Sequence, residues 1–276
     1  MRYFPFIPLL FLGFSPSQAS VITLESQVKN TVRQDAVDVM VTVTNRGDET
    51  AHNIQITVKS PLSSKQSDVF SALPVGEKHS ESSTHSLRGL HPGLYPLIVQ
   101  IGYTDANLYP FSAMAISPLI YKTGSVSSIL GRLGNVKVRQ NGRLNLKVKN
   151  LEGQNKQVAI QLLAPREISV ENSPVKIDLP AGAESQISFP VHNFSALQNS
   201  TYAVYATMEY EENGTHYTAL APGTLFIAPP NLLSSIQSYL GPVFILLLAF
   251  GLLIGGRIYW ELKKGTAKPS SPGIRR

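Results

Sequence analysis

The stretch VDVMVTVTNRGDETAHNIQITV, residues 37–58, decides the fold class. Apolar and polar residues alternate from Val37 to Thr44, and the alternation resumes from Ile54 to Val58. A period of two is typical of β-strands with one buried face, because successive side chains point to opposite faces of a sheet. The residues Asn45-Arg46-Gly47-Asp48 supply turn chemistry between the two runs. The stretch therefore predicts a β-hairpin with one buried face.

Segments of the same kind continue along the chain, separated by polar, Gly and Pro clusters. They are Tyr95–Tyr103, Leu144–Val148, Val158–Leu163, Ile187–Val191 and Tyr202–Tyr210. No amphipathic helical pattern interrupts them, and strands at this spacing bury a core as two facing sheets. The expected fold is all-β: two tandem Ig-like β-sandwiches, followed by one C-terminal transmembrane α-helix.

An internal repeat supports the number of sandwiches. The order strand, Asn45, polar turn, strand and Pro61 recurs as strand, Asn150, polar turn, strand and Pro165. In each copy a strand with two tyrosines eight residues apart follows: Tyr95 and Tyr103, then Tyr202 and Tyr210. Preserved order and spacing indicate a duplicated module. We expect one sandwich over residues 20–117 and a second over 118–227, joined by a short junction that limits their reorientation.

The C-terminal region predicts a membrane anchor. An uncharged apolar run from Leu240 to Gly256 nearly spans a hydrocarbon core, and Tyr239, Tyr259 and Trp260 extend it into the interfacial layers. We therefore expect a Pro-containing spacer at 228–238, a transmembrane helix at 239–260 and a basic cytoplasmic tail at 261–276. Arg257 begins the basic flank, which the positive-inside rule places in the cytoplasm. Lipid is accordingly one expected partner.

The N-terminus agrees with this orientation. Arg2 precedes an apolar run from Phe4 to Phe14, and small residues follow at Ser17-Gln18-Ala19. This is the layout of a secretory signal peptide over residues 1–19, cleaved after Ala19. The sequence thus predicts a single-pass type I protein of the cell membrane, with its sandwiches periplasmic or extracellular.

Charge and cysteine content narrow the class of protein. The net charge is +6, but residues 20–256 hold equal numbers of basic and acidic side chains, so the excess lies at the two ends. The exported part has no basic footprint for DNA or RNA, and we expect no nucleic-acid partner. Cysteine is absent, so buried apolar surface without disulfides must stabilise the sandwiches, which is ordinary for bacterial envelope proteins.

The stretch from residue 41 to 61, VTVTNRGDETAHNIQITVKSP, resembles the bacterial Ig-like modules called CARDB, for cell-adhesion-related domain. The resemblance covers Val37–Tyr109 and, more weakly, Leu144–Tyr217, where Leu151-Glu152-Gly153 replaces the usual small polar turn. It implies an Ig-like sandwich with a role in envelope adhesion or scaffolding and no shared active site. The chain layout is also similar to the β subunit of the translocon-associated complex, although that family has one sandwich.

Candidate chemistry in the sequence is sparse. One strand face would carry His79, Glu81 and His85, and His91 follows beyond a turn. In an extended strand, His79 and His85 would lie about 20 Å apart, too far to share one ion. We therefore expect no metal site. Asp48-Glu49 and Asp105 suit either calcium or ordinary turns. Glu211-Glu212 adjoins a predicted Asn213-Gly214 hairpin turn and should be solvated.

No arrangement of nucleophile, base and orienting group is visible, so we expect no catalytic residue, no cofactor and no enzyme activity. Tyr95 and Tyr103 either line a surface or pack in the core, and core packing is favoured. Gly251 and Gly255 form a small-residue pair that would permit a helix-mediated homodimer. The leading hypothesis is a non-catalytic envelope protein that binds or scaffolds another envelope protein or a glycan. The alternative is an accessory subunit of a secretion or translocation machine.

Overall fold

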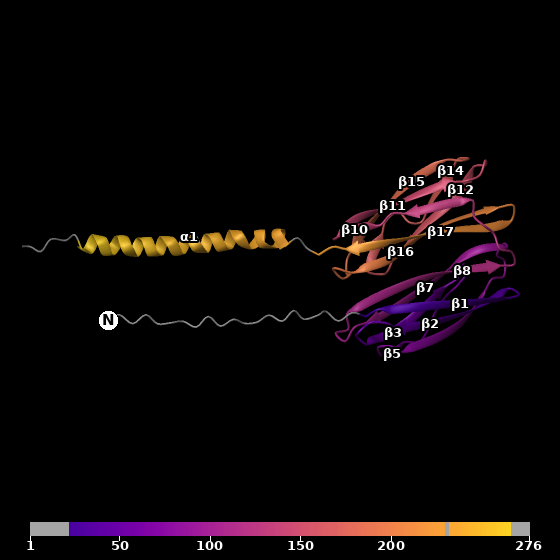
Figure 1. Cartoon of the computed structure of the whole chain (residues 1–276), viewed down its shortest axis with the longest axis horizontal. Helices are drawn as coiled ribbons and strands as arrows, with labels where there is room; N and C mark the ends of the chain where they lie inside the picture. Colours follow the sequence, from indigo (N-terminus) through magenta and orange to yellow (C-terminus); the bar gives the residue numbers. More distant parts are fainter. Residues whose placement is uncertain (1–21, 230–231, 266–276) are drawn as a thin grey trace, which may run out of the picture. The chain divides into compact units, whose positions relative to one another are not determined.

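The structure is a computed structural model that describes residues 22–229 and 232–265, with side chains of the helix described at 241, 242 and 244–260. The chain divides into two compact units, one ending at Ile227 and the other beginning at Ala228 (Figure 1). The signal peptide predicted at 1–19, with its cleavage at Ala19, lies outside the described residues. So do the tail from residue 266 onward and the side chains of Tyr239 and Leu240.

The first unit is all-β and contains two β-sandwiches. In the first sandwich, one sheet has the order β1-β2-β6 and the facing sheet contains β8, β7, β3, β4 and β5. The bounds are β1 Leu24–Arg33, β2 Ala36–Asn45, β3 Ala51–Lys59, β4 Ser64–Gln66, β5 Phe70–Leu73, β6 Lys78–Ser86, β7 Gly93–Thr104 and β8 Pro110–Tyr121. Every second residue along the central strands points inward. Val39, Ile56 and Val99 are examples, and they are almost completely buried.

The second sandwich has the same plan. One sheet has the order β13-β15-β11-β9, and the other contains β14, β12, β16 and β17, with β10 alongside β17. The bounds are β9 Ile129–Leu133, β10 Val136–Val138, β11 Asn141–Asn150, β12 Lys156–Leu163, β13 Ile168–Val170, β14 Val175–Leu179, β15 Glu184–Asn193, β16 Thr201–Glu212 and β17 Thr215–Ile227. All the strands predicted by alternation, including those around Leu144 and Ile187, are present.

The predicted hairpin at residues 37–58 is wrong. β2 pairs with β1 and β6, whereas β3 pairs with β7, β4 and β5 in the opposite sheet. The residues between them therefore cross from one sheet to the other. Alternation predicts each strand correctly but cannot choose its partner, because both strands bury one face of the same core.

A buried asparagine fixes this crossing in both sandwiches. The Asn45 side chain donates to the carbonyl oxygens of Glu49, at 2.7 Å, and Leu73, at 2.9 Å, and it accepts from the Gly47 backbone at 3.0 Å. Asn150 makes the matching bonds to Gln154, Leu179 and Glu152. Both asparagines are fully buried, so the repeated Asn satisfies backbone groups that would otherwise lack partners.

Strand neighbours confirm the internal repeat. β2 has β1 and β6 as neighbours, and β11 correspondingly has β9 and β15. In the opposite sheets β3-β7-β8 corresponds to β12-β16-β17. The Leu73-Pro74-Val75-Gly76 turn before β6 recurs as Leu179-Pro180-Ala181-Gly182 before β15, with a positive φ at each glycine. Sequence inspection missed this second signature of the duplication.

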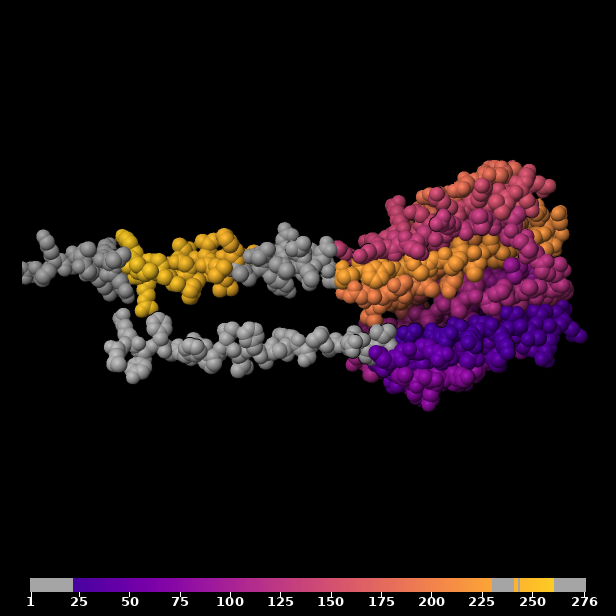
Figure 2. All heavy atoms as spheres, in the orientation of Figure 1, coloured from indigo at the N-terminus to yellow at the C-terminus, as the bar shows by residue number. Residues whose placement is uncertain are grey.

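The two sandwiches lie side by side (Figures 1 and 2). Hydrogen bonds also join them. A parallel bridge between His216 of β17 and Gly93 of β7 joins one sheet of each into a ten-stranded sheet. Ser117 and Pro118, where the sequence places the junction, lie inside β8, which remains paired with β7 as far as Tyr121. The connection to the second sandwich therefore begins after Tyr121.

The second unit contains one helix, α1, from Leu232 to Gly265, with Pro242 inside it. Exposed apolar side chains are found along its described part, among them Phe244, Leu252 and Tyr259. Within the residues that the structure describes, no helix is both long enough and apolar enough to cross a membrane. A transmembrane role for 239–260 thus gains no support from the structure and stays a prediction from the sequence.

Candidate functional site

A groove between the two sandwiches gathers ionisable side chains from both. Two adjacent depressions, of about 480 and 500 Å³, share Gln161, Glu209, Glu211 and His216. The first sandwich contributes Lys59, His91, Pro96, Ile98 and Gln100 to the wall. We call this surface the inter-sandwich groove.

β17 holds His216 at the base of the inter-sandwich groove. The His216 backbone N–H donates to the carbonyl oxygen of Pro92 at 2.8 Å, and the Ser125 hydroxyl donates to the His216 carbonyl at 2.8 Å. The approach is so close that a Cβ on Gly93 would lie 2.0 Å from the His216 carbonyl oxygen. Glycine at position 93 is therefore a condition for the contact between sandwiches.

The His216 imidazole connects the first sandwich to the carboxylates of the second. Its ring stacks on Tyr95 with centroids 4.0 Å apart, and its Nε2 lies 3.2 Å from an oxygen of Glu209. Nδ1 is buried and has no hydrogen-bond partner among the described residues, although a Glu211 oxygen lies 3.8 Å away. His216 therefore links an aromatic ring of the first sandwich to the acidic end of β16 in the second.

A second imidazole–carboxylate pair lies at the rim of the groove. Nδ1 of His91 is 3.1 Å from the Glu211 carboxylate, and the Tyr95 hydroxyl donates to the His91 carbonyl oxygen at 2.9 Å. Burial first, and the negative charges of Glu211 and Glu209 next, raise the pKa of Tyr95 to about 12. Tyr95 therefore stays a neutral hydrogen-bond donor throughout the physiological range.

The groove presents carboxylates, amides and imidazoles above an apolar floor. Pro96, Ile98 and Leu163 are partly buried beside Gln100 and Gln161. Planar amides and carboxylates are suited to hydrogen bonding with hydroxyl groups of a sugar or with a peptide backbone. The arrangement can therefore bind and orient a polar ligand.

A second buried contact between the sandwiches lies away from the groove. The Ser112 backbone N–H and hydroxyl both donate to the Glu167 carboxylate, the hydroxyl at 2.6 Å, and the Arg166 N–H donates back to the hydroxyl at 2.9 Å. Glu167 is 3% exposed, so the bonds from Ser112 compensate the desolvation of its charge. Burial, and then the charge of Glu167, raise the pKa of Tyr103 nearby.

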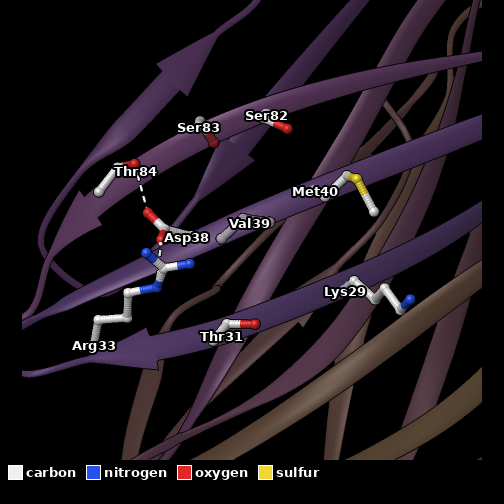
Figure 3. A pocket seen from close by; sticks show the side chains of 9 residues that line it. All are labelled: Lys29, Thr31, Arg33, Asp38, Val39, Met40, Ser82, Ser83 and Thr84. Atoms are coloured by element: carbon white, nitrogen blue, oxygen red, sulfur yellow. Dashed lines mark hydrogen bonds and ion pairs between the residues drawn. The ribbon is translucent and has the colours of Figure 1, made fainter.

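A shallow polar depression of about 420 Å³ lies on the outer face of β1, β2 and β6 (Figure 3). Asp38 is at its centre, 3.3 Å from the Arg33 guanidinium, and it accepts a hydrogen bond from Thr84 at 2.7 Å. Its lining also includes Lys29, Thr31, Val39, Met40, Ser82 and Ser83. All these side chains come from one sheet of one sandwich, and the ion pair is solvent-exposed, so we rank this surface below the inter-sandwich groove.

The histidines considered for a metal site are kept apart by the fold. Nε2 of His79 lies 2.7 Å from Glu81, whereas His85 is buried between the hydroxyls of Ser63 and Ser83. His91 lies at the inter-sandwich groove. Over the described range, residues 22–229 and 232–265, no group of three or more His, Cys, Asp or Glu side chains is placed to hold a metal.

The acidic turn residues also have local partners. Asp105 accepts hydrogen bonds from the backbone of Asn107 and Tyr109 within its own loop. Glu212 accepts from the buried amine of Lys156 at 2.7 Å, and Glu211 bonds His91. Asn213 and Gly214 both have positive φ, as the predicted turn requires. Glu211 is exposed as expected, with its side chain 56% accessible, whereas Glu212 is partly buried against Lys156. Neighbouring chain segments supply their partners.

The tyrosines follow the core-packing prediction. Tyr95 and Tyr210 are buried, and Tyr103 and Tyr202 pack against the two cores. Of the predicted anchor residues, Gly251, Gly255, Arg257, Tyr259 and Trp260 lie on α1. Sequence inspection missed His216 and Glu209 as site residues. The only signal was that Glu209 and Glu211 share one face of a strand.

Comparisons with known proteins add little about function. No family model matches the chain, and no curated protein matches its sequence. Solved structures with partial similarity include a mutant of Salmonella alpha-2-macroglobulin, with 11% identity and a TM-score of 0.31 over 76% of this chain and 16% of that one. Red sea bream transglutaminase gives 11% identity and a TM-score of 0.28 over 75% of this chain and 32% of that one.

A Porphyromonas gingivalis W83 protein of unknown function shares 9% identity at a TM-score of 0.32, over 74% of this chain and 99% of that protein. The chain spans less than a third of the macroglobulin and transglutaminase chains. Identities and TM-scores this low carry no inference about what the chain does.

Proposed function

We propose that this chain is a non-catalytic, single-pass envelope protein that binds or positions another envelope component through the inter-sandwich groove. The component is a protein or a glycan. The carrying observation is that His91 and Tyr95 of one sandwich meet His216, Glu209 and Glu211 of the other in one concave surface.

Contacts between the sandwiches support a preformed binding surface. The bonds from the His216 N–H to Pro92 and from the Ser125 hydroxyl to the His216 carbonyl hold the two walls of the groove together, and the Ser112–Glu167 contact joins the sandwiches away from the groove. A preformed surface binds more tightly because less conformational entropy is lost on association. The resemblance of Val37–Tyr109 to CARDB modules supports a role in adhesion or scaffolding.

Membrane anchorage is the second part of the proposal. Its support is the sequence: the uncharged run Leu240–Gly256, the aromatic flank at Tyr259 and Trp260, and the basic tail. Under this proposal residues 1–19 are a signal peptide and the sandwiches lie outside the cytoplasm. Alkaline extraction of membranes is a direct test, since the full chain should remain in the pellet and a variant lacking 240–256 should be released.

Site-specific photo-crosslinking from membranes solubilised in mild detergent tests the binding surface. A crosslinking amino acid at Gln161, which is exposed in the groove, should give an adduct with an envelope protein or glycan. The matched control is Asn145, exposed on β11 in the other sheet of the same sandwich. Equal adducts at both positions, or none at Gln161, would contradict a role for the groove.

Replacing residues 239–260 by an unrelated transmembrane helix separates this function from the alternative of a translocation subunit. If the sandwiches do the binding, the crosslink from Gln161 persists with a foreign anchor. If the span is the main docking element, the partner is lost although the chain stays in the membrane.

A further inference from the structure

We propose that the first unit carries an apolar patch that rests on the lipid surface, at the end where the chain leaves toward α1. The patch consists of Leu108, Tyr109, Phe111, Phe194 and Leu197, and we call it the exit-end patch. The inference rests on the proposed membrane anchorage and adds a second, peripheral contact with the same bilayer.

Strand direction places the patch at the exit end. β7 and β17 run parallel from the Gly93–His216 bridge, so their last residues, Thr104 and Ile227, point toward the same end of the unit. The loop after Thr104 presents Leu108 and Tyr109. The chain leaves the unit at Ile227, and the apolar run from Leu240 follows within thirteen residues.

Contacts join the patch across the two sandwiches. Phe111 lies 5.6 Å from Tyr103 and 5.2 Å from Tyr109, measured between ring centroids. The Tyr109 hydroxyl donates to the Ser195 carbonyl oxygen at 2.9 Å, beside Phe194. A depression of about 280 Å³ is lined by Tyr103, Phe111 and Phe194 together. The aromatic side chains of the two sandwiches therefore lie around one depression, whose lining also includes Arg166 and Glu167.

The exposure of the side chains in the exit-end patch indicates that a partner covers them. Leu108 is 69% exposed, Phe194 63%, Leu197 44% and Tyr109 40%. Single exposed apolar residues are common, but a cluster of large ones marks an interaction surface. Aromatic and leucine side chains at loop tips are suited to the boundary between headgroups and acyl chains.

Backbone strain at Leu108 is an independent observation. Leu108 has φ +63°, a left-handed conformation that is costly for a residue other than Gly, Asn or Asp. Asp105 holds the loop in this shape by accepting hydrogen bonds from the N–H groups of Asn107, at 2.9 Å, and Tyr109, at 2.8 Å. The loop thus holds Leu108 in an unfavourable backbone conformation, and its side chain faces solvent. Backbone strain that is kept at one residue indicates a function for that side chain.

Lipid is the occupant that the position favours. Under the proposed anchorage, the thirteen residues from Ile227 to Leu240 tether the exit end of the unit to the bilayer. A patch at this end meets the lipid surface without a further partner, and burying its apolar area there is favourable by the same effect that drives folding.

Tryptophan quenching in vesicles of brominated phosphatidylcholine tests the proposal with the full chain. Trp260 is the only tryptophan, so its quenching in the wild type reports anchorage alone. Phe194→Trp in a Trp260→Phe background reports the patch. Val126→Trp in the same background is the control, because Val126 is 92% exposed and adjoins Ser125, which bonds Leu94 and His216 at the opposite end.

We expect brominated lipid to reduce the fluorescence of the wild type and of the Phe194 variant and to leave the Val126 variant unchanged. The length of β7 separates the two ends by roughly 36 Å, well beyond contact quenching. Quenching at Trp260 without quenching at Phe194 would overturn the patch and leave the anchorage standing. No quenching at Trp260 would overturn the anchorage itself.

Two further outcomes also decide the question. Equal quenching of the Phe194 and Val126 variants would mean that the unit lies on the lipid without orientation, which overturns an end-specific patch. If Phe194→Trp does not fold, Leu197→Trp takes its place, since Leu197 is exposed and belongs to the same patch.

Discussion

The imidazole of His216 lies flat on the phenol ring of Tyr95, with centroids 4.0 Å apart and an angle of 5° between the ring planes. The two residues are 121 positions apart and belong to different sandwiches, so the stack is one of the contacts that join the two modules. Both residues also line or underlie the inter-sandwich groove. Stability of the junction and shape of the groove therefore depend on the same pair.

A double-mutant cycle tests this stack. Tyr95→Leu and His216→Ala should each lower the free energy of unfolding, and their coupling energy should be about 0.5–1.5 kcal/mol, the range measured for aromatic pairs. Chemical denaturation of the purified full chain in detergent gives the four values. Strict additivity of the two changes would contradict an energetic contact.

Gly93→Ala should disrupt the junction more strongly. The new Cβ would lie 2.0 Å from the His216 carbonyl oxygen, and φ is +150° at this residue. A displaced backbone at a strained position costs about 2–4 kcal/mol. Gly153→Ala is the matched control, since nothing lies within 4 Å of its Cβ position. Similar unfolding midpoints for the two variants would show that the sandwiches are joined by other contacts.

Asn150→Ala should destabilise the second sandwich by about 2–4 kcal/mol, because several buried backbone groups lose their partners at once. The amide of Asn150 bonds three carbonyl oxygens and one N–H group. Asn145→Ala, on the same strand but exposed, should change the unfolding free energy by less than about 0.5 kcal/mol. An equal effect of the two substitutions would contradict a stabilising role for the hydrogen bonds of Asn150.

Stability should fall as the pH falls below about 6.5, in part because of His85. Burial first, and the Lys65 charge next, lower the pKa of His85 in the folded protein below its ordinary value of 6.5. The unfolded chain then binds the proton more tightly, so the stabilisation is complete above pH 6.5 and is lost below it. Urea midpoints measured from pH 8 to pH 5 should decline less steeply for His85→Gln.

Lys65→Gln gives a second measurement of the same effect. Without the Lys65 charge the folded-state pKa of His85 should rise toward its ordinary value, and the acid-side decline should become smaller than in the wild type. Identical slopes in the wild type and in both variants would exclude His85 as the source of the pH dependence.

Leu108→Asn should weaken lipid contact without lowering the free energy of unfolding. Asparagine tolerates the left-handed conformation at lower cost, so the variant should be as stable as the wild type or more stable, by up to about 1 kcal/mol. In vesicles, however, the quenching measured through Phe194→Trp should weaken. A destabilised Leu108→Asn variant would show that the leucine packs in the fold and is not held for an external surface.

Much of the fold follows from local pattern. Alternation around Val39, Ile56 and Leu146 predicts strands because every second side chain must be buried, and the repeated Asn45 and Asn150 predict a duplication. The strand β6, with the sequence KHSESSTHS, lacks apolar alternation, and only the shared parity of His79, Glu81 and His85 indicates a strand there. It lies at the edge of its sheet, and only His85 is fully buried, so little apolar periodicity remains in its sequence.

The sequence alone determined an all-β region made of two similar modules, a charge-balanced body and an apolar run near the C-terminus. Only the tertiary structure decided that the chain crosses between sheets after Asn45, that Gly93 admits the backbone of His216, and that His91 meets Glu211 from 120 residues away. The physical reason is that burial acts locally on each strand through side-chain alternation. Pairing between sheets and modules depends on close approaches and hydrogen bonds that form only when distant segments meet.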